Sequence, residues 1–227
     1  MTSPHAQEVR QRLDAAGVFW MYEGDPRRDA PHALLTSNKH SNGYVDVGKV
    51  LKEQPETRKT FARFILDLVG TNFDWVVGAD TSSTALAKDI AKLAGAGHIR
   101  MVKTEDKNGN KRQVWSPENA SLHSYDLILH IEELITTSFS AFQVREGIRR
   151  TYPIGPGSFF PYLPVVVERS DPDNRVVRVE DSIVLPLLQL NIRNFEPNPR
   201  TCPYCAVGSE AIKPKESDNW ARLTGKV

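Results

Sequence analysis

The stretch LILHIEELITTSFSAF, residues 127–142, places two adjacent carboxylates just before a hydroxyl-rich turn. Its apolar first half predicts a strand, and the residues after the turn predict a helix. Unpaired amides and the positive end of the dipole make a helix N-terminus suitable for phosphate. The hydroxyl donors there are Thr136, Thr137, Ser138 and Ser140.

Glu132 and Glu133 would repel a phosphate that touched them, but they suit ribose hydroxyls or the Mg²⁺ that accompanies a diphosphate. The turn therefore predicts a site for a sugar phosphate. Taken alone, it fits a capped helix beside two solvated carboxylates at least as well.

Continuous apolar strands alternate with amphipathic helices through the middle of the chain. Strands are predicted within 73–80, 98–104, 126–134 and 162–169, and helices within 55–70, 81–97 and 138–150. This alternation predicts an α/β fold, with a mostly parallel sheet covered by helices on both faces.

The remaining segments are more polar. Ser3 and Pro4 have the residue types of an N-cap and a first helical position, so a further helix is expected there. Residues 34–51 predict short extended pieces joined by turns, and 104–124 predict a polar loop. Beyond Ser170 the chain is expected to be irregular, apart from 179–190.

Three polar clusters follow predicted strands: GADTSSTA (78–85), KTEDKNGNKR (103–112) and EELITTSFSA (132–141). Ligands of open α/β sheets gather beyond the carboxyl ends of the strands. The three clusters are therefore expected to converge on one site.

The overall charge excludes some partners. Twenty-nine basic and 28 acidic residues give a net charge of +1, so neither nucleic acid nor a membrane surface is indicated. No apolar run approaches the roughly 20 residues that span a bilayer, and no signal-peptide pattern opens the chain. A soluble, cytoplasmic protein is the expectation.

IEELITTSFS resembles the signature of type I phosphoribosyltransferases, which in orotate phosphoribosyltransferases often reads like VVEDVVTTGGS. The resemblance extends over nearly the whole chain. HALLTSNKHSNGYVDV is similar to HFxLTSGxHSDxYxxK, and WVVGADTSSTALA stands at the place of the pyrophosphate loop GPxxGGxxLA. KTEDKNGNK resembles the mobile catalytic loop, and CPYCAVGSEAIKPK resembles the CPLCxxGxxxxKP tail of one branch. The order and spacing of these motifs identify the chain as similar to orotate phosphoribosyltransferases.

The resemblance implies a single domain, 1–227, with a core at about 56–170 and a hood formed by 1–55 and 171–227. It implies transfer of the phosphoribosyl group of phosphoribosyl pyrophosphate (PRPP) to orotate, giving orotidine 5′-phosphate and pyrophosphate in pyrimidine (UMP) biosynthesis. Mg²⁺ is expected to be held mainly through PRPP rather than by a protein metal site. A homodimer is expected, with the basic loop reaching the neighbouring site.

The resemblance also implies a role for each matching residue. Glu132 and Glu133 would hold the ribose hydroxyls, Lys103 and Lys107 would neutralise the departing pyrophosphate, and Arg169 would pair with the orotate carboxylate. The phosphate turn would comprise Thr136, Thr137, Ser138, Phe139 and Ser140, and the pyrophosphate loop Asp80, Thr81, Ser82 and Ser83.

Several positions depart from the family pattern. Serine or phenylalanine replaces glycine at Ser82, Ser83, Ser138 and Phe139, Ala79 replaces proline, Asn38 replaces glycine, Glu133 replaces aspartate, and Asn108 stands next to the expected loop histidine. Two alternatives therefore stay open. One is a non-catalytic regulator that binds PRPP or a nucleotide, and the other is a transferase for another base.

Simpler explanations exist for other residues. The basic loop 103–112 could be solvated, Arg169 could be a surface ion-pair partner, and His130 is expected to be structural. Cys202 and Cys205 resemble half of a zinc site, which needs four ligands. Zinc would require a second chain or histidine ligands, so reduced thiols are expected.

Overall fold

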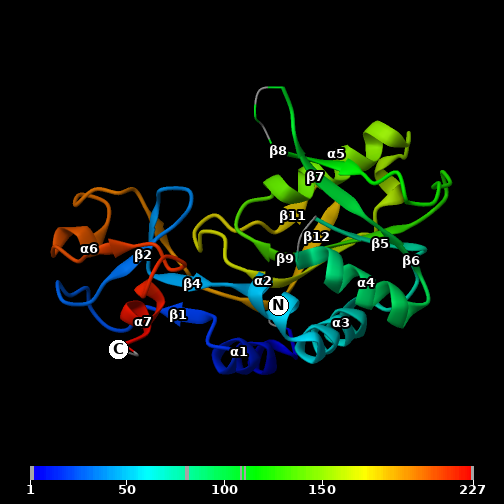
Figure 1. Cartoon of the computed structure of the whole chain (residues 1–227). Coiled ribbons are helices and arrows are strands. Elements are labelled where there is room, and N and C mark those ends of the chain that lie inside the picture. The colour runs from blue at the N-terminus through cyan, green and yellow to red at the C-terminus, as the bar shows by residue number, and fades with distance from the viewer. Residues whose placement is uncertain (1–2, 80–81, 108, 110, 226–227) are drawn as a thin grey trace.

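The computed structural model describes residues 3–79, 82–107, 109 and 111–225 (Figure 1). Its centre is a sheet with the strand order β11-β12-β10-β9-β5-β6. These strands are β5 (Trp75–Gly78), β6 (Gly97–Ile99), β9 (Ile128–Ile135), β10 (Tyr162–Glu168), β11 (Arg178–Val179) and β12 (Ser182–Gln189). All neighbours are parallel except the pair of β11 and β12. The mostly parallel sheet expected from the sequence is confirmed.

Helices cover both faces of this sheet. The helices α1 (Ala6–Ala15), α2 (Val47–Glu53), α3 (Pro55–Val69) and α4 (Ser82–Ala94) share one apolar core with the sheet, whereas α5 (Phe139–Thr151) packs on the opposite face. The neighbouring strand residues Val76 and Val77 are fully buried in these two different cores. This follows from the alternation of side chains along a strand.

A two-stranded antiparallel ribbon, β7 (Met101–Glu105) and β8 (Lys111–Trp115), projects from the core (Figure 1). Helix α5 packs closely against it: a Cβ on Gly147 would lie 2.2 Å from the backbone oxygen of Gln113, so only glycine fits there. The expectation of a continuous polar loop over 104–124 is therefore wrong for the two ribbon strands. Their alternating side chains pair across the ribbon, with Lys103 opposite Gln113.

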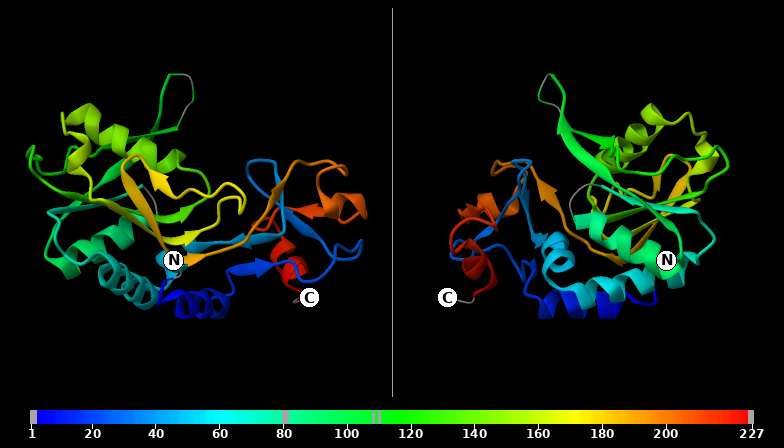
Figure 2. Two further views of the ribbon diagram at one scale, coloured as in Figure 1. Left: turned by 180° about the vertical axis from the view of Figure 1, so that it is seen from behind. Right: turned by 45° about the vertical axis from the view of Figure 1, so that its right-hand side comes forward.

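The hood lies at the far end of the molecule from β6 and α4 (Figures 1 and 2). One of its sheets has the order β13-β3-β2-β14, and a second pairs β1 with β4. The hood elements are β1 (Phe19–Met21), β2 (His32–Leu34), β3 (His40–Ser41), β4 (Gly43–Val45), β13 (Asn194–Phe195), α6 (Pro203–Ala206), β14 (Ala211–Ile212) and α7 (Asn219–Thr224). Segments from both ends of the chain thus interleave in it.

Some sequence expectations need correction. Helix α1 begins at Ala6 with His5 as its N-cap, so Ser3 and Pro4 precede the helix. Residues after Asp46 form α2 rather than an extended piece, because the Asp46 carboxylate accepts a hydrogen bond from the Lys49 amide and caps a helix. Within 171–227, β11 and β12 join the central sheet. Before β10, a short 3-10 turn spans Pro156–Ser158. Within the described ranges, no helix is long and apolar enough to cross a bilayer.

Candidate functional site

The carboxylates Glu132 and Glu133 lie near the carboxyl end of β9 and point to opposite faces of the sheet. Glu132 is on the α5 face beside His130, and its side chain is almost fully buried. Glu133 is on the α4 face, where its backbone N–H donates a hydrogen bond to Ser83 Oγ at 3.3 Å. In the register of β5 and β9, Gly78, the last residue of β5, pairs with Ile131, so both carboxylates extend past the end of β5.

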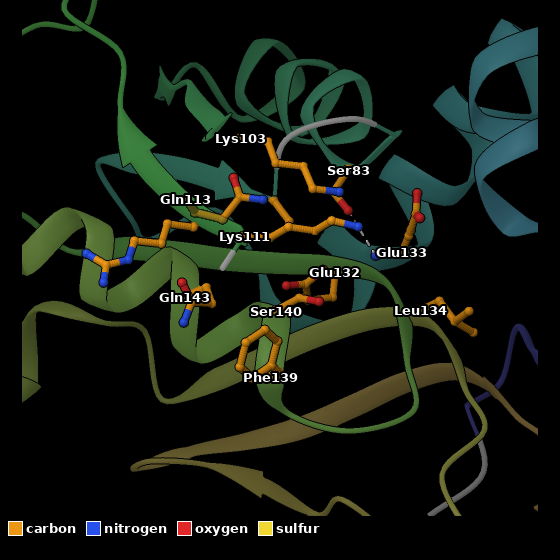
Figure 3. Close-up of a pocket in the computed structure, with 12 residues that line it drawn as sticks. Ser83, Lys103, Lys111, Gln113, Glu132, Glu133, Leu134, Phe139, Ser140 and Gln143 are labelled. Carbon is orange, nitrogen blue, oxygen red and sulfur yellow. Dashed lines mark hydrogen bonds between the residues drawn. The ribbon is translucent and has the colours of Figure 1, made fainter. Parts of the chain in front are cut away.

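A cavity of about 260 Å³ opens at this edge of the sheet (Figure 3). Residues from three of the sequence clusters line it, together with residues of the ribbon. They are Ala79, Ser83, Lys103, Lys111, Arg112, Gln113, Glu132, Glu133, Leu134, Phe139, Ser140 and Gln143. The end of β5, the ribbon of β7 and β8, the end of β9 and the start of α5 therefore converge on one space.

The cavity combines the two carboxylates with basic groups of the ribbon. Lys103 and Lys111 reach across it toward Ser83 and Glu133 (Figure 3). Arg112 also lines the cavity and forms a 2.7 Å ion pair with Asp106. Lys107 is exposed and does not line the cavity. Sequence reasoning assigned no role to Lys111, although its place in the basic cluster was visible.

Both carboxyl groups are held away from water without full hydrogen bonding. Burial raises the pKa of Glu132 to about 8. Burial also raises the pKa of Glu133 to about 7, against an opposing hydrogen bond from Ser82. Within the described part of the chain, Glu132 Oε1 and Glu133 Oε2 have no hydrogen-bond partner. Two such oxygens are suited to accept hydroxyl donors or to face a cation.

His130 lies close to both Glu132 and a buried arginine. Its Nε2 lies 3.4 Å from Glu132 Oε1, and Arg145 Nε donates to His130 Nδ1 at 3.4 Å. Because the arginine can only donate, His130 Nδ1 is the acceptor and Nε2 carries the hydrogen. Arg145 is itself fixed by Ser182 Oγ at 2.7 Å. The histidine that was expected to be structural thus presents its N–H side to the carboxyl group of Glu132.

The phosphate turn joins β9 to α5. Thr136, Thr137 and Ser138 form the turn, and Phe139 and Ser140 open the helix. Ser138 has φ −80°, an ordinary value, so this backbone does not need the glycine that the family pattern has there. Phe139 is 62% exposed and lines the cavity together with Ser140. The start of α5 therefore faces the same space as the carboxylates.

The pyrophosphate-loop candidates Asp80 and Thr81 lie outside the described residues, as does Asn108. Ser82 and Ser83 begin α4, and both contact Glu133. A Cβ on Gly48 of α2 would lie 2.6 Å from Ser82 Oγ. The serine side chains thus occupy the space between α2, α4 and β9.

Asn38 is another departure whose backbone the structure explains. It stands in the turn between β2 and β3 with φ +59°, in the left-handed region. Asparagine adopts this region more readily than most other residues with a side chain. The exchange of glycine for asparagine therefore keeps the turn.

Arg169 follows β10 and is buried, with an 8% exposed surface. Among the described residues, its Nε and Nη1 have no hydrogen-bond partner. Burial lowers the pKa of Arg169, and an electrostatic interaction with Tyr44 of β4 partly opposes this change. A surface ion pair, the simpler explanation from the sequence, is therefore excluded for those two nitrogens.

Hood residues that the sequence did not single out interact electrostatically with Arg169 and Glu133. Lys215 forms a 2.6 Å ion pair with Asp46 and also hydrogen-bonds Tyr44. Asp46 and Lys215 both act electrostatically on Glu133. Lys215 belongs to the KPK of the tail motif. The sequence could not place it near Glu133, because its position depends on the pairing of β14 with β2.

The pKa of Glu132 predicts a pH-dependent gain in stability on Glu132→Gln. An unfolded glutamate ionises near 4.5, whereas the folded one ionises near 8, so the parent loses stability as pH rises between these values. The variant has no such group. We expect the two proteins to unfold alike near pH 5 and the variant to be more stable at pH 8, by at most on the order of 1.4 kcal/mol per pH unit in this range.

Denaturant unfolding at several pH values measures this difference, with exposed Glu118→Gln as the matched control. A difference between Glu132→Gln and the parent that does not change with pH would show that Glu132 ionises normally in the folded protein.

Comparison with known proteins agrees with this geometry. No family model matches the chain. The chain is 28% identical over 184 residues to the orotate phosphoribosyltransferase of Desulforamulus reducens, covering 81% of this chain and 87% of the relative. It is 24% identical over 160 residues to the orotate phosphoribosyltransferase of Pyrococcus furiosus, covering 69% and 82%. The resemblance drawn from the motifs is confirmed.

Solved structures decide the fold. The orotate phosphoribosyltransferase from Aeropyrum pernix superposes with a TM-score of 0.56 at 15% identity, covering 80% of this chain and 93% of that one. The chain has the type I phosphoribosyltransferase fold. An adenine phosphoribosyltransferase from Rhodothermus marinus superposes at a TM-score of 0.52 with 16% identity, covering 81% and 99%. Transferases named for orotate and for adenine thus both resemble this fold, so the fold does not by itself identify the base.

Proposed function

We propose that this protein is an orotate phosphoribosyltransferase, which transfers the phosphoribosyl group of PRPP to orotate in pyrimidine biosynthesis. The observation that carries the proposal is the cavity in which Glu132 and Glu133 face Lys103 and Lys111 at the start of α5. This combination suits a sugar that bears hydroxyls, a 5′-phosphate and a diphosphate. Sequence similarity to proteins named orotate phosphoribosyltransferase supports orotate as the base.

The 5′-phosphate would bind the amides at the start of α5, with Thr136, Thr137 and Ser140 as additional donors. Phosphate is favoured there by the unpaired amides and the helix dipole. The ribose hydroxyls would donate to Glu132 and Glu133, whose unpaired oxygens then gain partners. This arrangement would fix C1 of the sugar at the mouth of the cavity.

In the reaction, the bond between C1 and a pyrophosphate oxygen breaks and a bond from C1 to a ring nitrogen of orotate forms, while that nitrogen loses its proton to the pyrophosphate or to solvent. Negative charge grows on the pyrophosphate as it departs, so fixed positive charges stabilise the transition state. Lys103 and Lys111 carry such charges in the cavity. Lys107 lies beyond the cavity of this protomer, and we assign it to the neighbouring site of a homodimer, as the family resemblance implies.

The donor set fits Mg²⁺, because the unpaired carboxyl oxygens of Glu132 and Glu133 at this cavity are hard ligands. The ion would be held mainly through PRPP oxygens, close to these two carboxylates. When bound, it would offset the charge of the diphosphate.

Arg169 would bind the orotate carboxylate. Its guanidinium is buried with two nitrogens unpaired, and a carboxylate can accept a bidentate pair of hydrogen bonds from such a fork. Tyr44 and Lys215 border this position from the hood. The proposed division is therefore a core that binds the sugar phosphate and a hood that helps to enclose the base. The proposed location is the cytoplasm.

The deciding experiment follows orotate absorbance after PRPP and Mg²⁺ are added to the full chain. We expect turnover that requires Mg²⁺ and stops with EDTA, because the charge of the diphosphate is then no longer offset. The same mixture with adenine in place of orotate is the matched control and should give no nucleotide. PRPP binding without product at any protein concentration would indicate a non-catalytic regulator, and turnover of adenine alone would indicate a transferase for another base.

A further inference from the structure

Four side chains with metal-binding atoms meet inside the hood, away from the cavity. His32 of β2 and His40 of β3 come from the N-terminal hairpin. Near the other end of the chain, Cys202 is the N-cap of α6 and Cys205 lies within that helix. Their ligand atoms all lie within 4.8 Å of one another. His32 and Cys202 are completely buried, His40 nearly so, and both cysteines are free thiols.

From this cluster we infer that the hood binds one Zn²⁺ ion in a tetrahedral site formed by His32, His40, Cys202 and Cys205. The set of two imidazoles and two thiolates is typical of structural zinc sites, and the two cysteines have the spacing of such sites. All four positions of the tetrahedron would be filled by protein, which leaves none for a reacting water. The site is therefore structural rather than catalytic.

Four of the six distances between the ligand atoms lie near those of a zinc tetrahedron. Zinc bonds to nitrogen and sulfur put neighbouring ligand atoms of a tetrahedron roughly 3.3–3.8 Å apart. His32 Nε2 lies 3.8 Å from Cys202 Sγ and 3.9 Å from Cys205 Sγ. His40 Nδ1 lies 2.9 Å from His32 Nε2 and 3.1 Å from Cys205 Sγ. The two distances from His40 Nδ1 are shorter than the expected spacing by only a few tenths of an ångström.

The orientation of His32 is fixed for metal binding by its other ring nitrogen. Ser209 Oγ donates its single hydrogen to the carbonyl oxygen of Ala30 at 2.7 Å. The contact of 2.8 Å between Ser209 Oγ and His32 Nδ1 must therefore be donated by the histidine. His32 then carries its hydrogen on Nδ1 and turns the Nε2 lone pair toward the cluster. Such an outer hydrogen bond is the usual way in which proteins orient a metal-binding histidine.

Aromatic rings shield the buried ligands of the cluster, whereas Cys205 stays partly exposed. The ring of Tyr204 stacks on His32 with centroids 5.2 Å apart, and Phe195 and Tyr22 pack against Tyr204 in turn. Which histidines could join the cysteine pair was not visible along the chain, because His32 is 170 residues from Cys202. The hairpin brings its two histidines together, and the parallel pairing of β14 with β2 brings the tail to them.

Zinc would clamp the tail to the N-terminal hairpin, where the hood sheet has only two-residue or three-residue strands. Short strands provide few ladder hydrogen bonds, and a metal that binds only the folded state stabilises it. The clamp would also hold Lys215 against Asp46 at the edge of the candidate site. Zinc would therefore order the part of the hood that borders the base.

Metal analysis of the full chain, purified under reducing conditions, tests the site. We expect one zinc per chain, and a visible spectrum of tetrahedral cobalt with thiolate ligands after exchange for Co²⁺. Cys202→Ser and His32→Gln should each lose stoichiometric zinc. His123→Gln, which changes an exposed histidine far from the cluster, should keep it. A reduced, metal-free chain that takes up neither Zn²⁺ nor Co²⁺ would overturn the proposal, as would half an ion per chain.

A further variant distinguishes metal binding from side-chain packing alone. Ser209→Ala removes the acceptor for His32 Nδ1 but no ligand, so it should keep one zinc per chain and bind it about 10–100-fold more weakly in chelator competition. Unchanged affinity would contradict the arrangement argued from Ser209.

Hydrogen exchange on the unmodified chain makes the test independent of variants that fail to fold. When Zn²⁺ is added to the metal-free chain, the backbone amides of 32–41 and 194–212 should exchange more slowly. Added Mg²⁺ should have no such effect. Equal protection with and without zinc would overturn the clamp. Orotate turnover is measured separately, so the zinc proposal and the proposed function can fail independently.

Discussion

Replacing Arg169 by methionine is expected to abolish most orotate turnover and at the same time to stabilise the ligand-free protein. Truncating one partner of a buried charge pair costs about 2–5 kcal/mol, which corresponds to a fall in kcat/KM for orotate of roughly 30-fold to 4,000-fold. The binding of PRPP should be unchanged, because Arg169 does not line the cavity of the carboxylates. Steady-state kinetics with each substrate varied measures this split.

The gain in stability has a different cause. Two nitrogens of the Arg169 guanidinium are buried without partners in the described part of the chain, and such groups cost roughly 1–3 kcal/mol each. Methionine has a similar length and no unpaired donors. We therefore expect a higher melting temperature, by about 2–4 °C for each kcal/mol regained.

Two further variants define the comparison. Arg169→Lys keeps the charge but not the planar fork, so it should also lose orotate turnover. Arg193→Met removes an arginine whose exposed ion pair with Asp173 lies on the surface, and it should change neither property. An unchanged KM for orotate in Arg169→Met would remove Arg169 from the base site, and a lower melting temperature would show that the guanidinium is paired in solution.

The parts of the fold that the sequence predicted are those that depend on local periodicity. The helix over 55–70 ends at Gly70 as expected, because its left-handed backbone, φ +72°, suits glycine. The strands β5, β9 and β10 were visible as continuous apolar runs, which buried parallel strands require. Helix α2 was missed, because its capping residue Asp46 follows a segment rich in turn residues.

The site was predictable where residues follow one another along the chain, and not where the fold brings distant residues together. Glu132, Glu133 and the turn after them could be read from one segment. Lys215 could not, because its contacts with Tyr44 and Asp46 depend on the pairing of the tail with the hairpin. The same long-range pairing places His32 and His40 beside the two cysteines.

The carboxylates and hydroxyls of the phosphate turn should respond to different parts of the ligand. Glu132→Gln and Glu133→Gln keep size but cannot ionise, so the comparison is made above pH 8, where both carboxyl groups of the parent carry charge. If the acids grip ribose hydroxyls and the Mg²⁺ of PRPP, each change should weaken PRPP binding about 10–100-fold, the usual worth of hydrogen bonds to a charged group. Ribose 5-phosphate should respond similarly. Free phosphate should bind no worse, since a nearby negative charge is gone.

Thr137→Val should give the complementary pattern. Thr137 is exposed at the turn before α5, so the isosteric valine should leave the fold intact. It removes one neutral donor near the helix N-terminus, which is worth about 0.5–1.5 kcal/mol, or roughly 2-fold to 10-fold in affinity. The loss should be similar for PRPP, ribose 5-phosphate and phosphate, because all three place a phosphate at that position.

Calorimetric titration of the three ligands against the three variants gives the whole pattern, with exposed Glu118→Gln as the control for loss of a charge elsewhere. A uniform loss across all ligands in Glu132→Gln would mean that the carboxylate supports the fold of the turn rather than the sugar. Parent-like binding by every variant would reduce the turn to a capped helix, because neither the buried carboxylates nor the hydroxyl at the start of α5 would then touch a sugar phosphate.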